Sequence, residues 1–100
     1  MQPGNGYPKL RLRVHVERPI RIRFFATARE AAGRSVSEID VPGKGLSVSQ
    51  VLELLTTQYP RLGPVLRTCR FVRNGEYLTG LSGRVFPGDE FAIHPPYTGG

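Results

Sequence analysis

Alternating apolar and polar residues mark three strands of this chain, because successive side chains of a strand point to opposite faces. The stretches are residues 20–25, 36–41 and 90–94. In the first of them one face carries Ile20, Ile22 and Phe24, and the other carries Arg21, Arg23 and Phe25. In the last, we expect Phe91 and Ile93 to face the core.

A fourth alternating stretch, residues 10–16, lies near the beginning of the chain and is followed by Pro19. Its polar side consists of Arg11, Arg13 and His15. This pattern predicts an added edge strand guarded by charge, or a segment that pairs only in a crystal or a complex. The sequence does not decide between the two, so residues 1–19 are interpreted as a basic N-terminal extension without an assigned role.

Helical spacing of apolar residues predicts one full helix over residues 48–59. Ser47 and Gln50 form a capping-box pattern before it, and Pro60 ends it. Residues 26–32 favour a short helix that ends at Gly33 as the C-terminal cap. A further short turn that adds to the core is indicated by Leu62, Val65 and Leu66.

Two turns complete the order of elements. Asn74-Gly75 predicts a tight hairpin between residues 70 and 78, since both residues tolerate positive φ. Pro87-Gly88-Asp89 predicts a turn before the last strand. The order strand, strand, helix, hairpin, strand is satisfied by an α+β fold in which one main helix packs across a mixed sheet. This is the β-grasp, ubiquitin-like topology, with the first and last strands side by side at the centre.

Composition and charge narrow the class of protein. One hundred residues with 39% hydrophobic content make one domain, and no apolar run is long enough for a membrane span or a secretory signal. A single cysteine, Cys69, fits a reducing compartment, so we expect a cytoplasmic protein. Of the net charge of +6, residues 1–23 carry +5. The charge excess is therefore local, and a solvated strand face explains it better than nucleic-acid binding.

The sequence ends in a segment of little side-chain bulk, residues 95–100, which we call the tail. Its residues are Pro95, Pro96, Tyr97, Thr98, Gly99 and Gly100. The proline pair ends a strand and holds the backbone extended, and glycine allows close approach from every side. A carboxylate at Gly100 could therefore enter a narrow channel of a partner, although a frayed glycine terminus explains the same residues.

Four blocks of the sequence resemble the MoaD family, the small sulfur-carrier subunit of molybdopterin synthase, within the MoaD/ThiS superfamily. They are the residues from Ile20 to Gly33, Val72-Arg73-Asn74-Gly75-Glu76-Tyr77, Pro87-Gly88-Asp89-Glu90-Phe91-Ala92, and the tail. The resemblance covers about residues 20–100 and implies a carrier domain at 20–94 followed by the tail at 95–100. Two features depart from the family: residues 1–19, and His94, which stands where the family usually has an apolar or aromatic residue.

The resemblance implies that an E1-like (MoeB-like) enzyme adenylates the Gly100 carboxylate with ATP. A sulfur-donor protein then converts the adenylate to a thiocarboxylate. This species delivers sulfur to cyclic pyranopterin monophosphate in the large (MoaE-like) synthase subunit. The chain would be a subunit and co-substrate that is not catalytic alone. Because it lacks a P-loop and a dinucleotide fingerprint, we expect it to bind no ATP or other cofactor by itself.

Other residues and other functions remain open. Cys69 has no visible acid–base partner and is interpreted as a structural residue, and His15 and His94 are too isolated to predict a metal site.

Phe25 either covers the far side of the sheet or forms an apolar docking patch, a role that His94 would share. The alternative functions are a sulfur carrier for thiamine, cysteine or tRNA thiolation, and a ubiquitin-like binding module whose Gly-Gly is never activated.

Overall fold

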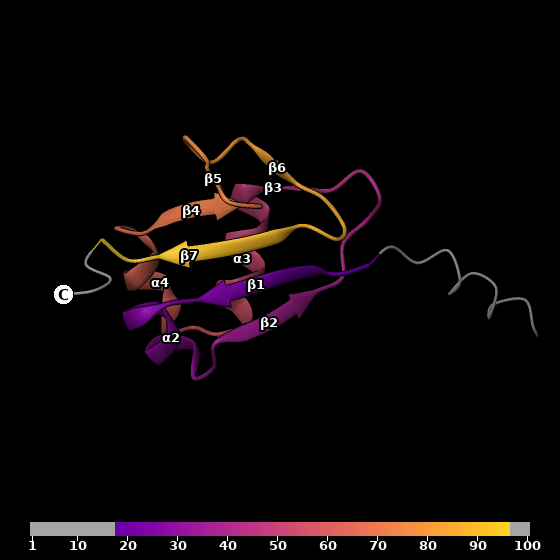
Figure 1. Ribbon diagram of the computed structural model, residues 1–100. Coiled ribbons are helices and arrows are strands. Elements are labelled where there is room, and N and C mark those ends of the chain that lie inside the picture. The colour runs from indigo at the N-terminus through magenta and orange to yellow at the C-terminus, as the bar shows by residue number, and fades with distance from the viewer. Residues whose placement is uncertain (1–17, 97–100) are drawn as a thin grey trace, which may run out of the picture.

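The protein is built on a five-stranded mixed sheet in the order β2–β1–β7–β4–β5, seen in a computed structural model that describes residues 18–96. The strands are β1 (Ile20–Phe24), β2 (Val36–Ile39), β4 (Arg70–Arg73), β5 (Glu76–Tyr77) and β7 (Glu90–His94). β1 and β7 are parallel at the centre, and the other neighbouring strands are antiparallel (Figure 1). The β-grasp prediction is confirmed, including the central pair.

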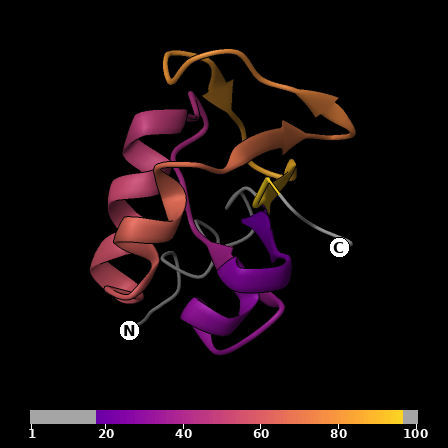
Figure 2. The ribbon, with the colours of Figure 1, turned by 90° about the vertical axis from the view of Figure 1, so that its left-hand side faces the viewer.

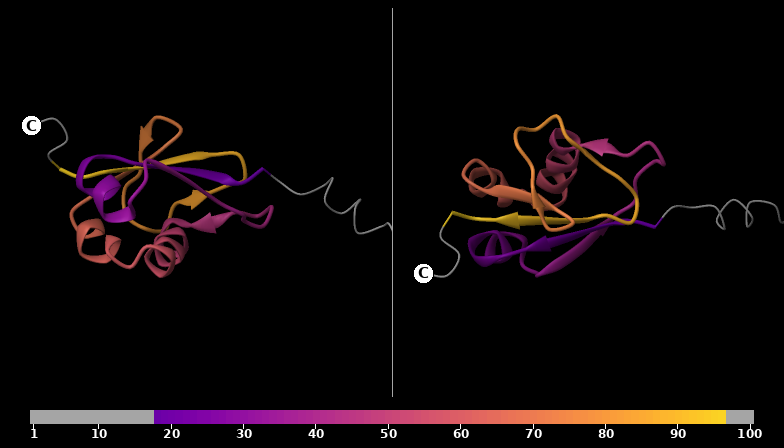
Figure 3. Two further views of the ribbon diagram at one scale, coloured as in Figure 1. Left: turned by 90° about the horizontal axis from the view of Figure 1, so that it is seen from below. Right: turned by 45° about the horizontal axis from the view of Figure 1, so that its top comes forward.

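Three helices accompany this sheet: α2 (Ala26–Ala32), α3 (Val48–Gln58) and α4 (Leu62–Leu66). α3 begins with the predicted capping box, in which the Ser47 hydroxyl accepts from the Gln50 amide and the Gln50 side chain accepts from the Ser47 amide. α2 ends at Gly33, whose φ of 77° is left-handed. α3 and α4 lie on the same face of the sheet (Figures 2 and 3).

The core lies between the sheet and these helices. Its largest fully buried side chains come from the inward face of the two central strands, from α3 and α4, and from β6 (Arg84–Val85), all of them at most 1% exposed: Ile20, Ile22, Phe24, Phe91, Ile93, Val48, Val51, Leu55, Leu62 and Val85. Tyr59 packs edge-on against Phe24 and shares a hydrogen bond of 2.9 Å with the buried Ser37 hydroxyl. The one buried polar side chain of the described residues is thereby satisfied.

Several boundaries differ from the sequence prediction. β1 ends at Phe24, and Phe25 continues in extended geometry as the residue before α2. A two-stranded sheet of β3 (Leu46–Ser47) and β6 (Arg84–Val85) was not predicted, because two-residue strands carry no periodic signal. Glycine at position 45 allows β3 and β6 to approach each other, because a Cβ there would lie 2.6 Å from the Val85 carbonyl oxygen and clash with it. The predicted strand at residues 10–16 lies outside the described residues.

The β4–β5 hairpin turns at Asn74 and Gly75, whose φ values are 49° and 88°, as the Asn-Gly pair predicts. The Asn74 side chain also joins the hairpin to the start of β7. Its amide donates to an Asp89 carboxylate oxygen at 3.0 Å, and its carbonyl accepts from the Glu90 amide at 2.9 Å. Asn74 is therefore both a turn residue and a cross-link between β4 and β7.

We expect Asn74→Ala to lower the free energy of unfolding by about 1–2 kcal/mol, because it removes two hydrogen bonds and places alanine in a left-handed conformation. Urea denaturation measures this change. The control is Glu76→Ala, at an exposed position of the same hairpin, where the expected change is within about 0.5 kcal/mol. Equal losses for the two variants would show that the Asn74 side chain does not join the strands.

Candidate functional site

The last strand, β7, leads directly into the tail, and we call its end at His94 together with Pro95 and Pro96 the tail root. β7 ends at His94; Pro95, which follows it, is buried, and Pro96 is exposed. This end of β7 lies at the same end of the sheet as α2 and α4 (Figure 1). Tyr97, Thr98, Gly99 and Gly100 lie outside the described residues, so their predicted roles in threading and activation remain predictions.

The sheet face opposite α3 and α4 is covered by no described element, and we call it the outer face. Strand register places the following residues on it: Val36, Glu38, Arg21, Arg23, Phe25, Glu90, Ala92, His94, Arg70, Val72 and Tyr77. At its centre Ala92 and Val72 form a small apolar surface, which Arg23 borders on the other side of Ala92; Ala92 is only 7% exposed. A shallow hollow runs from this centre toward the tail root, lined by Val72, Ala92, Phe25 and His94 together with Arg23, Asn74, Gly75 and Glu90.

Phe25 and His94 are the two docking residues predicted from the sequence, and the structure brings them together. Their rings stack with centroids 4.4 Å apart and planes 13° from parallel. Both residues are half-buried. The stack leaves an aromatic surface at the edge of the hollow beside the tail root. The sequence prediction named both residues but missed their contact, because the contact depends on the parallel register of β1 and β7.

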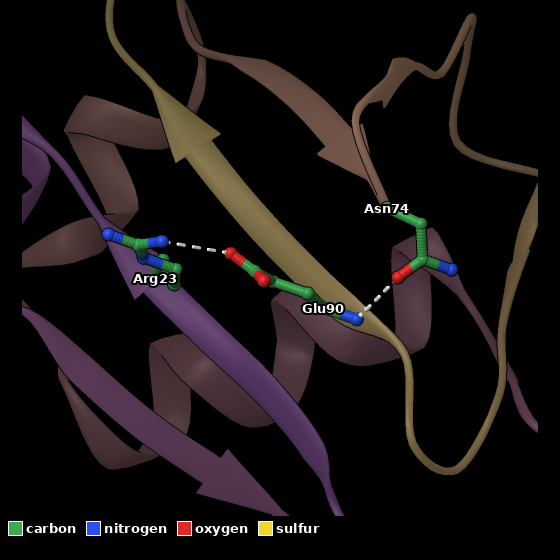
Figure 4. Close-up of polar contacts among 3 residues, drawn as sticks. All are labelled: Arg23, Asn74 and Glu90. Atoms are coloured by element: carbon green, nitrogen blue, oxygen red, sulfur yellow. Dashed lines mark hydrogen bonds and ion pairs between the residues drawn. The ribbon is translucent and has the colours of Figure 1, made fainter.

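Charges surround this apolar centre. The Arg23 guanidinium lies 5.3 Å from the Phe25 ring centroid and forms a 3.2 Å ion pair with Glu90, whose backbone amide is bound by Asn74 (Figure 4). Both side chains of the ion pair are more than two-fifths exposed. The pair therefore holds the Arg23 side chain in place but contributes at most about 1 kcal/mol to the stability of the fold. Arg21 and Arg70 on the same face form no ion pair with a described residue. Around its apolar centre the outer face therefore carries charges of both signs, from Arg21, Arg23 and Arg70 and from Glu38 and Glu90.

Cys69 lies away from this face, beside an apolar hollow between α3, α4 and β4. Its thiol donates to the Val65 carbonyl at 3.2 Å, and burial raises its pKa to about 11. A thiol that stays protonated at neutral pH is a poor nucleophile. The structural interpretation of Cys69 is thus supported by its surroundings.

The described part of the chain offers few other sites. Between residues 18 and 96, no group of three or more His, Cys, Asp or Glu side chains is placed to hold a metal ion. Within the same range, no helix has the length and apolar character that crossing a membrane requires. His15 lies outside the described residues.

A β-grasp domain that leads its last strand into a Gly-Gly tail is the architecture of the ubiquitin-like carrier proteins. The family model described as the ThiS family matches residues 22–100, and this chain belongs to that family. The molybdopterin synthase sulfur carrier subunit of Drosophila yakuba is 36% identical over 83 residues, covering 81% of this chain and 90% of the relative.

Solved structures share the fold. SAMP1 from Haloferax volcanii superimposes with a TM-score of 0.70 and 30% identity, covering 82% of this chain and 99% of the other. The complex of subunits 1 and 2 of the molybdopterin-converting factor from Helicobacter pylori contains a chain that matches with a TM-score of 0.59 and 20% identity. This match covers 82% of the present chain and 99% of the other, and at that identity it is a likeness of fold.

Proposed function

We propose that this chain is the sulfur carrier subunit of a molybdopterin synthase, working in the cytosol. The observation that carries the proposal is that the family match extends through residue 100, so that it includes both the β-grasp domain and the Gly-Gly tail. Relatives of similar length that bear this name add to it. The outer face then supplies the docking surface, and the tail supplies the reacting group.

The chemistry proposed for the tail begins at the Gly100 carboxylate, which is a poor electrophile. In an E1-like partner, a carboxylate oxygen attacks the α-phosphorus of ATP and pyrophosphate leaves. Hydrosulfide supplied by the donor protein then attacks the acyl carbon, AMP leaves, and loss of a proton gives the thiocarboxylate. The partners supply ATP, the acid and base groups and the sulfur, whereas this chain supplies an accessible terminus.

In the proposed synthase, the thiocarboxylate sulfur attacks a carbon of cyclic pyranopterin monophosphate bound in a MoaE-like large subunit, and an oxygen substituent of that carbon leaves. Water then attacks the acyl carbon, which leaves the sulfur on the pterin product and restores the Gly100 carboxylate. The apolar centre of the outer face lies next to the tail root, so a partner that binds this face would have the tail close to its own active site. An apolar centre with a charged rim is the usual composition of such an interface.

The docking surface is tested by Phe25→Glu. A carboxylate at this half-buried position would have to lose its hydration when the partner binds, so we expect the affinity for a synthase large subunit to fall by at least about tenfold. Isothermal titration calorimetry measures the affinity, and circular dichroism checks the fold.

The matched control is Leu54→Glu, which places the same charge at a residue that is 44% exposed on α3, an element on the other side of the sheet. Its affinity should equal that of the wild type. If both variants bind equally well, the outer face is not the docking surface. If the wild type binds no large subunit but accepts sulfur from an E1-like enzyme, the carrier serves another pathway.

A further inference from the structure

The root of the tail is held by contacts on both its backbone and its side chain. The Phe25 amide donates to the Ile93 carbonyl at 3.3 Å, one residue before His94. The Phe25 ring then stacks on the His94 ring at 4.4 Å. Phe25 therefore contacts both the backbone of Ile93 and the ring of His94, the last residue of β7.

The backbone next to Phe25 has an unusual conformation. Ala26 has a φ of 51°, in a region that residues with a Cβ rarely occupy. At this point the chain leaves the sheet and enters α2, in which the amides of Ala28 and Arg29 donate to the Phe25 carbonyl. The unfavourable turn confines the change of direction to Ala26, so that Phe25 keeps extended geometry against β7.

The buried Pro95 extends this arrangement into the tail. Proline has a fixed φ, and the residue before a proline is restricted to extended conformations. A fixed His94 followed by Pro95 and Pro96 therefore leaves few directions for the chain that comes next. His94 is paired with Arg70 of β4 on one side, and the stack with Phe25 adds a restraint on its ring, directly before the two prolines.

We infer that Phe25 is a positioning residue for the start of the tail: by stacking on His94, it sets the direction in which Pro95 and Pro96 leave the sheet. This inference rests on the proposed function and adds to the docking role of the same face an action within the free protein. A terminus that already points toward the partner's channel loses less conformational entropy when it reaches the reactive geometry. The aromatic character of His94, more than its charge, is what the stack requires.

The kinetic test is ATP–pyrophosphate exchange by an E1-like enzyme, with the carrier as the varied substrate. Loss of a docking contact alone raises KM, whereas a misdirected tail lowers kcat in the bound complex. We expect Phe25→Ala and His94→Ala to lower kcat by about tenfold. His94→Phe, which retains the stack, should restore kcat to near the wild-type value.

Tyr77→Ala is the matched control. Tyr77 is 63% exposed on the outer face but belongs to β5, which is separated from β7 by β4. This variant should raise KM and leave kcat unchanged. Variants at Phe25 and His94 that raise only KM, as Tyr77→Ala does, would overturn the positioning role.

A second measurement needs no partner. Backbone ¹⁵N relaxation of His94 and ¹³Cα relaxation of Pro96 in the free protein should show lower order in Phe25→Ala and wild-type order in His94→Phe. Unchanged order in Phe25→Ala would also overturn the inference. If the enzyme does not activate the wild type, the proposed function fails, and the relaxation result alone decides whether Phe25 positions the tail.

Discussion

One alanine added after Gly100 is expected to abolish sulfur loading while leaving the fold unchanged. The added residue moves the carboxylate beyond the second glycine and puts a Cβ where the proposed mechanism needs a bare backbone. The core is expected to be unaffected, because its buried side chains come from residues 20–93. Intact mass after incubation with an E1-like enzyme, ATP and a sulfur source reports the loading, and thermal unfolding reports the fold.

An alanine added before Met1 is the matched control for this extension. It lengthens the chain by the same residue at the other end, and loading should equal that of the wild type. If the protein extended after Gly100 still accepts sulfur at its terminus, the requirement for a free Gly100 carboxylate is wrong.

Phe91→Ala should lower the free energy of unfolding by about 3–5 kcal/mol, the largest stability effect that we expect from a single truncation. Phe91 is fully buried on β7, opposite Ile22 of β1 and stacked on Phe71 of β4 at 5.7 Å. The variant leaves a cavity between the central strands and below α3. Because small domains are stable by only about 5–15 kcal/mol, part of the population should unfold under mild urea.

Phe86→Ala provides the comparison for Phe91→Ala. The same side chain is removed at a position that is 42% exposed, so the loss should be less than half as large. Urea titrations of both variants against the wild type measure the difference. Similar losses would contradict the assignment of the core to the inward face of β7.

The sequence predicted the sheet well where one face is buried. Alternation located β1, β2 and β7, and in β7 it correctly assigned Phe91 and Ile93 to the core. The capping box located the start of α3, and Asn-Gly located the hairpin. Each of these signals is local, which is why it can be read without knowledge of the tertiary structure.

Features that depend on contacts between distant residues were not predicted. The β3–β6 pair joins residues about forty positions apart, and the Asn74 cross-link depends on where β7 begins. The left-handed Ala26 carries no signal, because alanine is not a typical residue for that conformation. The stack of Phe25 on His94 follows only from the parallel register of two strands at opposite ends of the domain.

The candidate site also has one part that the sequence predicts, the tail, and one part that needs the structure, the outer face. The tail chemistry was inferred from the order of residues and from a family resemblance, since a terminal carboxylate on glycine needs no fold to be recognised. For the proposed docking surface the sequence named only Phe25 and His94, and the rest needed the structure, because the outer face combines residues from five strands. Its apolar centre and charged rim are properties of this arrangement, which no single stretch of sequence contains.

The central claim is that Gly100 accepts sulfur, and intact mass spectrometry of the wild-type protein tests it most directly. After incubation with an E1-like enzyme that loads a known carrier, ATP and a sulfur source, the mass should increase by the difference between one sulfur and one oxygen atom. Fragmentation should assign the increase to Gly100. An unchanged mass under conditions in which the known carrier is loaded would contradict the account.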